Sequence, residues 1–113
     1  MLIYKICHSA EWALAEREGL YAGSAKDHED HFMHFSTAEQ VLGTLERHYA
    51  DASDLVLVAV DPKTLGPTLK YEPSRGGALF PHLYGTLPLT FVQWVKAIRR
   101  GADGAFVLPR ECA

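Results

Sequence analysis

The run at residues 55–60, Leu-Val-Leu-Val-Ala-Val, is followed directly by Asp61-Pro62 and is the strongest fold signal in this 113-residue chain. Six consecutive apolar residues rich in valine are typical of a strand that is covered on both faces. Shorter apolar runs on both sides of it predict further strands, over residues 2–7, 31–35, 68–72, 91–98 and 105–108. The sequence therefore predicts a sheet that contains a buried strand at residues 55–60.

Two helices are predicted ahead of that strand. Residues 11–17 have strong helix propensity, with Ser9 as the N-cap and Gly19 as the C′ stop. A second helix is predicted to begin at Ser36, because Ser36 and Glu39 fit a capping box and apolar residues then recur at helical spacing. Two helices near the front with most strands behind them indicate an α+β fold.

The remaining segments predict connections rather than regular elements. Residues 22–30 are polar and predict a loop, and proline and glycine are frequent over residues 73–88, which predicts irregular structure there. We find no internal repeat and no interdomain linker. The length is close to the commonest size of one domain, so we expect a single domain over residues 1–113.

The composition argues against several classes of partner. The formal net charge is −3, from 14 acidic and 11 basic residues, whereas proteins that bind a long nucleic acid carry an excess of Lys and Arg. No run approaches the ~18 apolar residues of a membrane span, and the N-terminus does not resemble a signal peptide. We therefore expect a cytoplasmic protein with no membrane partner, and the sequence leaves its oligomeric state open.

A first group of candidate ligand-binding residues lies where residues 31–35 meet the predicted second helix. His34, Ser36 and Thr37 combine an imidazole, two hydroxyls and the backbone N–H groups of a helix start, which attract phosphate or carboxylate. This combination predicts a corner that binds the ribose and phosphate of a nucleotide. The alternative is structural: Ser36 caps the helix and His34 hydrogen-bonds to backbone.

A second group lies in residues 71–85, a long segment too rich in aromatic residues for a disordered linker. Glu72 ends a predicted strand, a common place for a catalytic carboxylate, and His82 and Tyr84 share one face if the chain is extended. We take Glu72 and His82 as candidate catalytic residues and Tyr84 as a candidate ligand-binding residue. The alternative is an ordered Ω-type loop whose aromatic side chains fill the core.

The tip of the same segment offers groups for a phosphate. The guanidinium of Arg75 can form a fork with a phosphate, and Gly76 and Gly77 supply unhindered backbone N–H groups. No metal site is expected, because His28, His31 and His34 are three residues apart in a segment that predicts a strand in part.

Several of these strings together resemble the bacterial domain-of-unknown-function family 952. The resemblance runs from about residue 2 to 109 and rests on His-Phe-Ser-Thr at 34–37 and Phe-Pro-His-Leu-Tyr-Gly at 80–85. Between them, Asp-Leu-Val-Leu at 54–57 and Tyr-Glu at 71–72 fit the same order. That family looks like a compact relative of the ADP-ribosyltransferase fold, which implies small, split antiparallel sheets with NAD folded into a cleft between them.

The resemblance also implies roles for the candidate residues. His34 would hold a ribose, with Ser36 or Thr37 beside it, and Glu72, His82 and Tyr84 would fill the remaining roles around the nicotinamide end. NAD is then a substrate, and no resident cofactor is called for.

Three functions remain open at this point. The chain could transfer ADP-ribose or hydrolyse the nicotinamide–ribose bond, with a carboxylate such as Glu72 stabilising the positive charge that develops on the sugar. It could instead bind a nucleotide or an RNA end without catalysis, an alternative favoured because the candidate site residues include no Glu-x-Glu pair, the motif usual in ADP-ribosyltransferase toxins. It could also be an interaction domain in which His82 and Tyr84 only pack.

Overall fold

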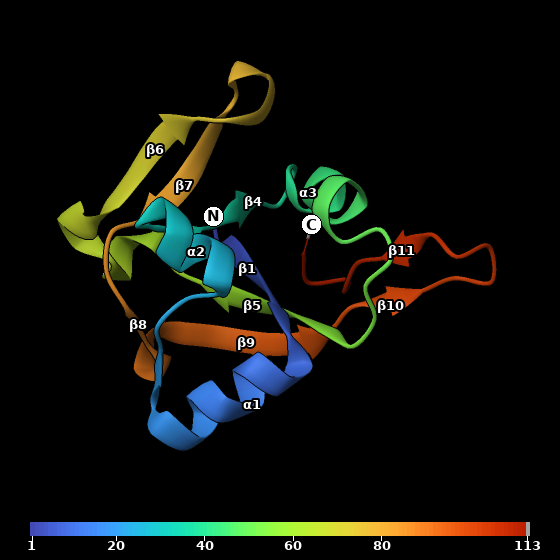
Figure 1. Cartoon of the computed structure of the whole chain (residues 1–113), viewed down its shortest axis with the longest axis horizontal. Helices are drawn as coiled ribbons and strands as arrows, with labels where there is room; N and C mark the ends of the chain where they lie inside the picture. The colour runs from blue at the N-terminus through green and yellow to red at the C-terminus, as the bar shows by residue number, and fades with distance from the viewer. Residues whose placement is uncertain (113) are drawn as a thin grey trace.

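Strand β5 (Leu55–Val60), the apolar run of the sequence, lies inside a four-stranded antiparallel sheet in the order β4-β1-β5-β9 (Figure 1). Its neighbours are β1 (Ile3–His8) and β9 (Val92–Ala97), and β4 (Ser36–Thr37) covers one end of β1. The computed structural model describes residues 1–112 of the chain. Val58, Ala59 and Val60 are fully buried, as a strand covered on both faces requires.

A second antiparallel sheet of three strands has the order β3-β7-β6 and projects from the first (Figure 1). Its strands are β3 (Met33–His34), β7 (Leu79–Leu83) and β6 (Leu69–Pro73). Two short pairs complete the strands, namely β2 (Leu20–Tyr21) with β8 (Leu87–Pro88), and β10 (Arg99–Arg100) with β11 (Phe106–Val107). Single 3₁₀ turns cover Pro62–Thr64, Gly66–Thr68, Arg75–Gly77 and Leu89–Phe91.

The two larger sheets are joined at one buried residue. Phe35 separates β3 in the second sheet from β4 in the first, and its backbone N–H donates to the carbonyl of Pro81 in β7 at 2.9 Å. Gln40 adds a second link, because its side-chain amide donates to the carbonyl of Leu79 at 2.8 Å. On the edge of β1 that faces away from β5, only the short strand β4 pairs with β1 among the described residues, at Ile3 and Tyr4.

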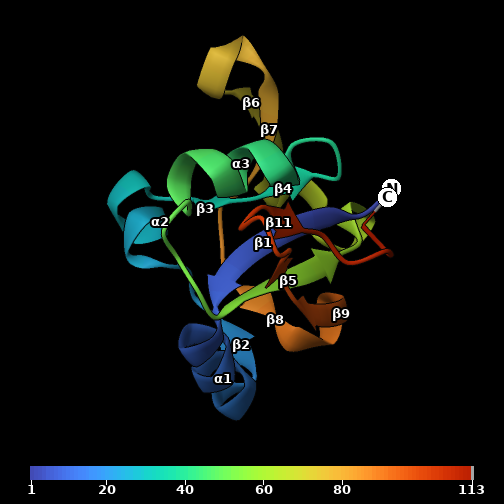
Figure 2. The same ribbon diagram turned by 90° about the vertical axis from the view of Figure 1, so that its right-hand side faces the viewer.

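Two of the three helices cover opposite faces of the first sheet. Helix α1 (Ser9–Glu18) packs Trp12 into the core that holds Ile3, whereas α3 (Val41–His48) packs Leu45 against Tyr4. Ile3 and Tyr4 are adjacent in β1, so their side chains point to opposite faces. Figure 2 shows α1 and α3 on the two sides of β1 and β5.

The third helix corrects the prediction of two helices. Residues 22–30 are not only a loop, because α2 spans Ala25–Asp30. The hydroxyl of Ser24 accepts from the N–H of Asp27 at 3.2 Å, and the Asp27 carboxylate accepts from the N–H of Ser24 at 2.9 Å. This capping box stabilises a helix too short and polar to show an apolar stripe.

The predicted helix start at Ser36 is also wrong. Ser36 and Thr37 pair with Tyr4 and Ile3 as β4, and α3 begins at Val41. The N-cap of α3 is Gln40, whose side chain accepts from the N–H of Thr37 at 3.0 Å, so Ser36 and Thr37 precede the helix N-terminus. Pairing with β1 outweighs the local capping signal because it extends the main sheet.

The third correction concerns residues 73–88, which contain strands β7 and β8 rather than irregular structure throughout. Proline is tolerated at position 81 because β3 has ended there, and the Pro81 carbonyl accepts from Phe35 instead. The α+β class and the small antiparallel sheets are confirmed. Within the described part of the chain, no helix is long and apolar enough to cross a membrane.

Candidate functional site

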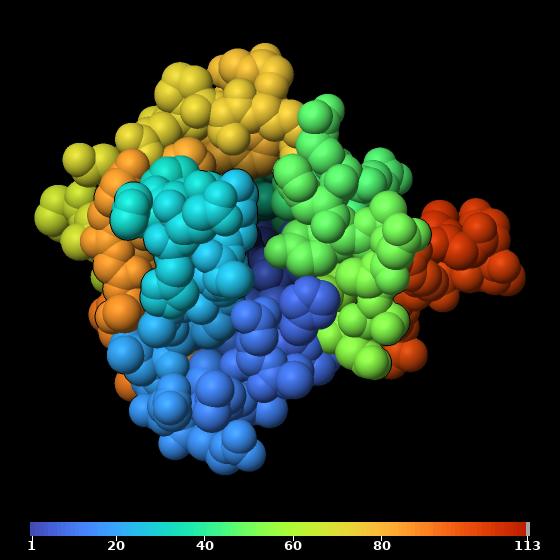
Figure 3. Space-filling model, in the orientation of Figure 1, coloured from blue at the N-terminus to red at the C-terminus, as the bar shows by residue number. Residues whose placement is uncertain are grey.

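A pocket of about 540 Å³ lies on the unpartnered edge of β1. Strand β4 pairs only with Ile3 and Tyr4, so Lys5 and Ile6 come to the floor of the pocket. Helix α2 forms one wall, α3 the other, and the β6–β7 hairpin the roof. Figure 3 shows this hollow between α2 in cyan and α3 in green, with the blue chain of β1 at its bottom. The volume falls in the range of small-molecule sites.

The α2 wall is anchored by a buried ion pair. The ammonium of Lys5 lies 2.9 Å from Oδ2 of Asp27, and both side chains are 3% exposed. Oδ1 of Asp27 accepts from the backbone N–H of His34 at 3.1 Å and lies 2.6 Å from its ring Nδ1. With the Ser24 contact, both oxygens of this carboxylate are occupied by donors, and β1, α2 and β3 are held together through it.

These contacts keep Asp27 ionised. Burial by itself raises the pKa of the Asp27 carboxyl, but the hydrogen bond from His34 and the charge of Lys5 outweigh burial. The pKa of Asp27 is therefore held well below its usual range.

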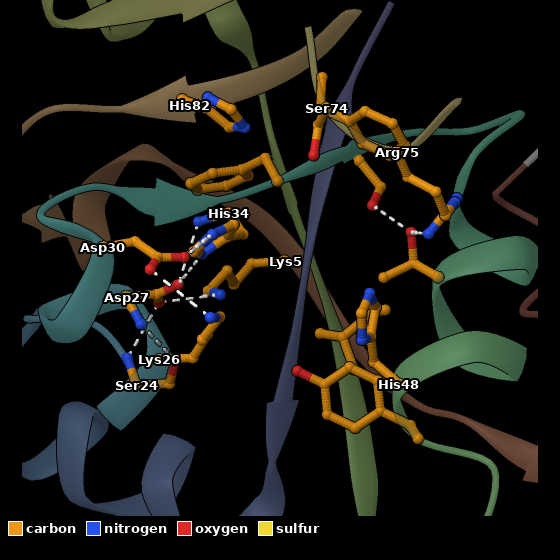
Figure 4. Close-up of a pocket in the computed structure, with 16 residues that line it drawn as sticks. Lys5, Ser24, Lys26, Asp27, Asp30, His34, His48, Ser74, Arg75 and His82 are labelled. Carbon is orange, nitrogen blue, oxygen red and sulfur yellow. Dashed lines mark hydrogen bonds and ion pairs between the residues drawn. The ribbon is translucent and has the colours of Figure 1, made fainter. Parts of the chain in front are cut away.

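His34 lies between two carboxylates. Besides Nδ1 on Asp27, its Nε2 is 2.8 Å from Oδ2 of Asp30, at the end of α2. Both contacts are hydrogen bonds only when both ring nitrogens carry a proton, because a carboxylate can only accept. The ring is thus held at the pocket wall, with both nitrogens in contact with carboxylates (Figure 4).

His82 has a different environment one strand away. Its Nδ1 is 2.8 Å from Oε1 of Glu72, and the hydroxyl of Tyr84 donates to the same oxygen at 2.7 Å. The hydrogen bonds from His82 and Tyr84 lower the pKa of Glu72, and the bond to Glu72 raises the pKa of Tyr84. His82 is 4% exposed and lines the pocket, and its Nε2 has no hydrogen-bond partner in residues 1–112.

Phe32 packs the two histidines together. Its ring stacks on His82 with centroids 4.0 Å apart and an interplanar angle of 30°, and its centroid is 4.6 Å from that of His34. Tyr84 lies at 5.4 Å on the same ring, and the two histidine rings are 5.7 Å apart. The pairing of His34 with His82 across β3 and β7 produces this cluster.

The opposite side of the pocket is formed by α3 and the hairpin tip. Arg75 lies there with Nη1 3.4 Å from the hydroxyl of Thr44, which is itself 3.2 Å from the hydroxyl of Ser36. His48 ends α3 on the same side, and Figure 4 shows it with Arg75 across the pocket from Asp27 and Asp30.

The sequence-predicted residues divide into three groups. His34, Ser36, Arg75 and His82 line the pocket. Glu72 and Tyr84 do not line it, and they reach it through His82. Thr37, Gly76 and Gly77 are not brought to the pocket: Thr37 pairs within the main sheet, and the glycines form the turn of the hairpin, at φ 67° and 82°. The N–H of Gly77 donates to the carbonyl of Ser74.

Sequence reasoning missed several polar residues of the pocket, namely Lys5, Asp27, Asp30, Thr44 and His48. Two signals were available. Lys5 is the single charge in an apolar strand, which indicates a buried partner, and Ser24 and Asp27 have the spacing of a capping box. The described residues contain no group of three or more His, Cys, Asp or Glu side chains arranged to hold a metal.

Comparison with known proteins identifies relatives of this chain by family and by structure. The family described as "Protein of unknown function (DUF952)" matches residues 6–95. The crystal structure of protein CC0527 from Caulobacter crescentus is similar over 99% of this chain and 98% of that chain, with 42% identity and a TM-score of 0.93. The solution structure of CC0527 gives 44% identity and a TM-score of 0.83 over 92% of this chain and 90% of that chain. No curated protein matches.

Proposed function

This chain belongs to the DUF952 family, and we propose that it binds a nucleotide of the NAD class in the pocket and cleaves the bond between nicotinamide and ribose. The observation that carries the proposal is the pair Glu72–His82. The carboxylate fixes Nδ1 of His82, and Nε2 is left without a protein partner in residues 1–112 at the wall of the pocket.

Such a histidine has the arrangement of a general base. With Nδ1 protonated and donating to Glu72, the lone pair of His82 is on Nε2. In the proposed reaction, the bond from C1′ of the ribose to the nicotinamide nitrogen breaks, and its electron pair leaves with nicotinamide. The oxygen of water bonds to C1′, and the proton of that water passes to Nε2 of His82 and then to solvent. The products are ADP-ribose, nicotinamide and a proton.

The charges of the pocket favour an anionic ligand. Lys5, Lys26 and Arg75 line it against two acids, Asp27 and Asp30, although the whole chain carries −3. The pyrophosphate of a dinucleotide would meet this excess of positive charge. The split between two small antiparallel sheets, with the pocket at their junction, supports an ADP-ribosyltransferase-like fold, in which an acceptor hydroxyl would replace water.

A nucleotide-binding module without catalysis is a second candidate function. It is favoured by His34, whose two ring nitrogens both contact carboxylates, and by Glu72, which does not line the pocket and cannot itself meet a positive sugar there. In that case His82 would hydrogen-bond the ligand with Nε2 and take no proton.

The test combines binding with product release. NAD is titrated by calorimetry, and nicotinamide release is followed by chromatography, for wild type, His82→Gln and Glu72→Gln. The control is His28→Gln, an exposed histidine outside this pocket. We expect nicotinamide release by wild type and the control, and a loss of about 10²-fold or more in His82→Gln, the usual contribution of a general base. Binding without release supports the non-catalytic module, and the absence of both would overturn the proposal.

A further inference from the structure

Among the residues that the structure describes, Arg75 is the one charged lysine or arginine of the pocket without a carboxylate partner. Lys5 and Lys26 each contact a carboxylate, whereas none of the ion pairs formed within residues 1–112 includes Arg75. Its one side-chain hydrogen bond is the 3.4 Å contact to Thr44, and it is half-buried. A guanidinium carries five N–H donors, so most of those of Arg75 have no acceptor within residues 1–112.

This guanidinium is nevertheless held in place from three sides. It lies over the ring of Phe80, with Cζ 4.9 Å from the centroid, and Thr44 contacts it from α3. The third side is Gly43 of α3, which has no side chain to fill the space beside the guanidinium. A Cβ added there would be 3.2 Å from Nη2 of Arg75. Glycine inside a helix costs about 1 kcal/mol relative to alanine, and at Gly43 the missing side chain leaves room for the guanidinium of Arg75.

The groups around Arg75 favour the phosphate of a ligand over a carboxylate supplied by this protein. Ser74, Ser36 and Thr44 bring hydroxyls to this side of the pocket, and His48 lies at the end of α3 (Figure 4). Partial burial and the charges of Arg75 and Arg47 lower the pKa of His48, as expected where positive charge is not neutralised. The acids Asp27 and Asp30 are both engaged by His34 on the other wall.

We infer that Arg75, held by Gly43, Thr44 and Phe80, is a binding site for the phosphate group of a ligand, at the side of the pocket opposite His34. This inference rests on the proposed function for the identity of the ligand. It adds the orientation of the nucleotide in the pocket. The phosphates lie against α3 and the hairpin tip, and the sugar that reacts lies near His82. Gly43 is a positioning residue, because a Cβ there would require the guanidinium to shift by a few tenths of an ångström.

The test uses inorganic pyrophosphate, titrated by calorimetry at low ionic strength into wild type, Arg75→Gln, Gly43→Ala and the double variant. The control is Arg17→Gln, an exposed arginine of α1 that changes the net charge equally. We expect Arg75→Gln to bind about tenfold or more weakly and the control to bind as wild type. Gly43→Ala should bind several-fold more weakly while its unfolding midpoint stays equal or rises, and it should have no effect once Arg75 is replaced.

Equal affinity in wild type and Arg75→Gln would overturn the site, and a loss in Gly43→Ala that persists in the double variant would overturn the role of Gly43. The proposed function fails separately. If pyrophosphate binding depends on Arg75 but NAD neither binds nor releases nicotinamide, the anion site stands and the NAD assignment falls. If NAD binds and Arg75→Gln leaves its affinity unchanged, the site assigned here is wrong and the pocket stands.

Discussion

The two walls of the pocket differ in how completely their polar atoms are partnered. On the α2 wall, Asp27 accepts from Lys5, Ser24 and His34, and His34 uses its remaining nitrogen on Asp30. On the α3 wall, Arg75 makes one long hydrogen bond and no ion pair with any of the residues described. Both walls flank the same edge of β1, so their place in the fold does not explain why the polar atoms of only one wall are fully partnered.

This difference distinguishes charged groups that hold the fold together from a charged group that is available to a ligand. A buried ion pair that is fully hydrogen-bonded is costly to break but binds nothing further. A half-buried guanidinium with free donors is satisfied only by water or by an anion. His82 lies between these two cases, because Glu72 fixes one ring nitrogen and the other has no partner among the described residues.

Removing the charge of Asp27 should have the largest effect on stability. Asp27→Asn keeps the shape of the side chain but leaves Lys5 buried without a counter-charge. We expect the free energy of unfolding to fall by about 3–5 kcal/mol, as for other broken buried pairs. Urea denaturation measures it. Asp51→Asn, an exposed position without a side-chain hydrogen bond, is the control and should change stability little. A loss below about 1 kcal/mol in Asp27→Asn would mean that the α2 wall is not held by this pair.

Acid should weaken the same wall by titration. The pKa of Asp27 is lowered by folding, so its contribution to stability is fully present above the unfolded pKa of about 4 and is lost as pH falls below it. The difference in unfolding free energy between wild type and Asp27→Asn should therefore shrink steadily below pH ~4. The effect is smaller than the substitution because protonation is incomplete over the accessible pH range. A difference that stays constant to pH ~3 would contradict the assignment.

The sequence predicts much of the fold because the strongest strands are determined locally. Residues 55–60 alone indicate a buried strand, and β5 has these bounds. Helix α1 ends as predicted at Gly19, which has φ 77°. The errors occur where tertiary pairing decides. Ser36 and Glu39 have a capping signal, yet Ser36 joins β1 because this extends the main sheet, and helix α2 has no apolar stripe to reveal it.

The candidate site is predictable in part for the same reason. His34 and His82 were singled out separately, and only the pairing of β3 with β7 brings their rings to 5.7 Å. Phe32, which packs against both, carries no signal of its own in the sequence. The expected role of Gly76 and Gly77 rested on free N–H groups, which a sequence cannot distinguish from the N–H groups of a hairpin turn. Whether any of these residues acts on a ligand stays a prediction.

The smallest effect should come from replacing Tyr84, the exposed residue that donates a hydrogen bond to Glu72. Tyr84→Phe removes one of the two hydrogen bonds that lower the pKa of Glu72, so that pKa should rise while His82 keeps it below the value of a free carboxyl. Tyr84 is 40% exposed, so the stability of the fold should change little. Carbon NMR of the Glu72 carboxyl against pH measures the change. Tyr71→Phe removes an exposed hydroxyl that has no partner within residues 1–112 and should leave the Glu72 titration unchanged. If Tyr84→Phe also left it unchanged, Glu72 would be held by His82 alone, and the orientation of His82 would not depend on Tyr84.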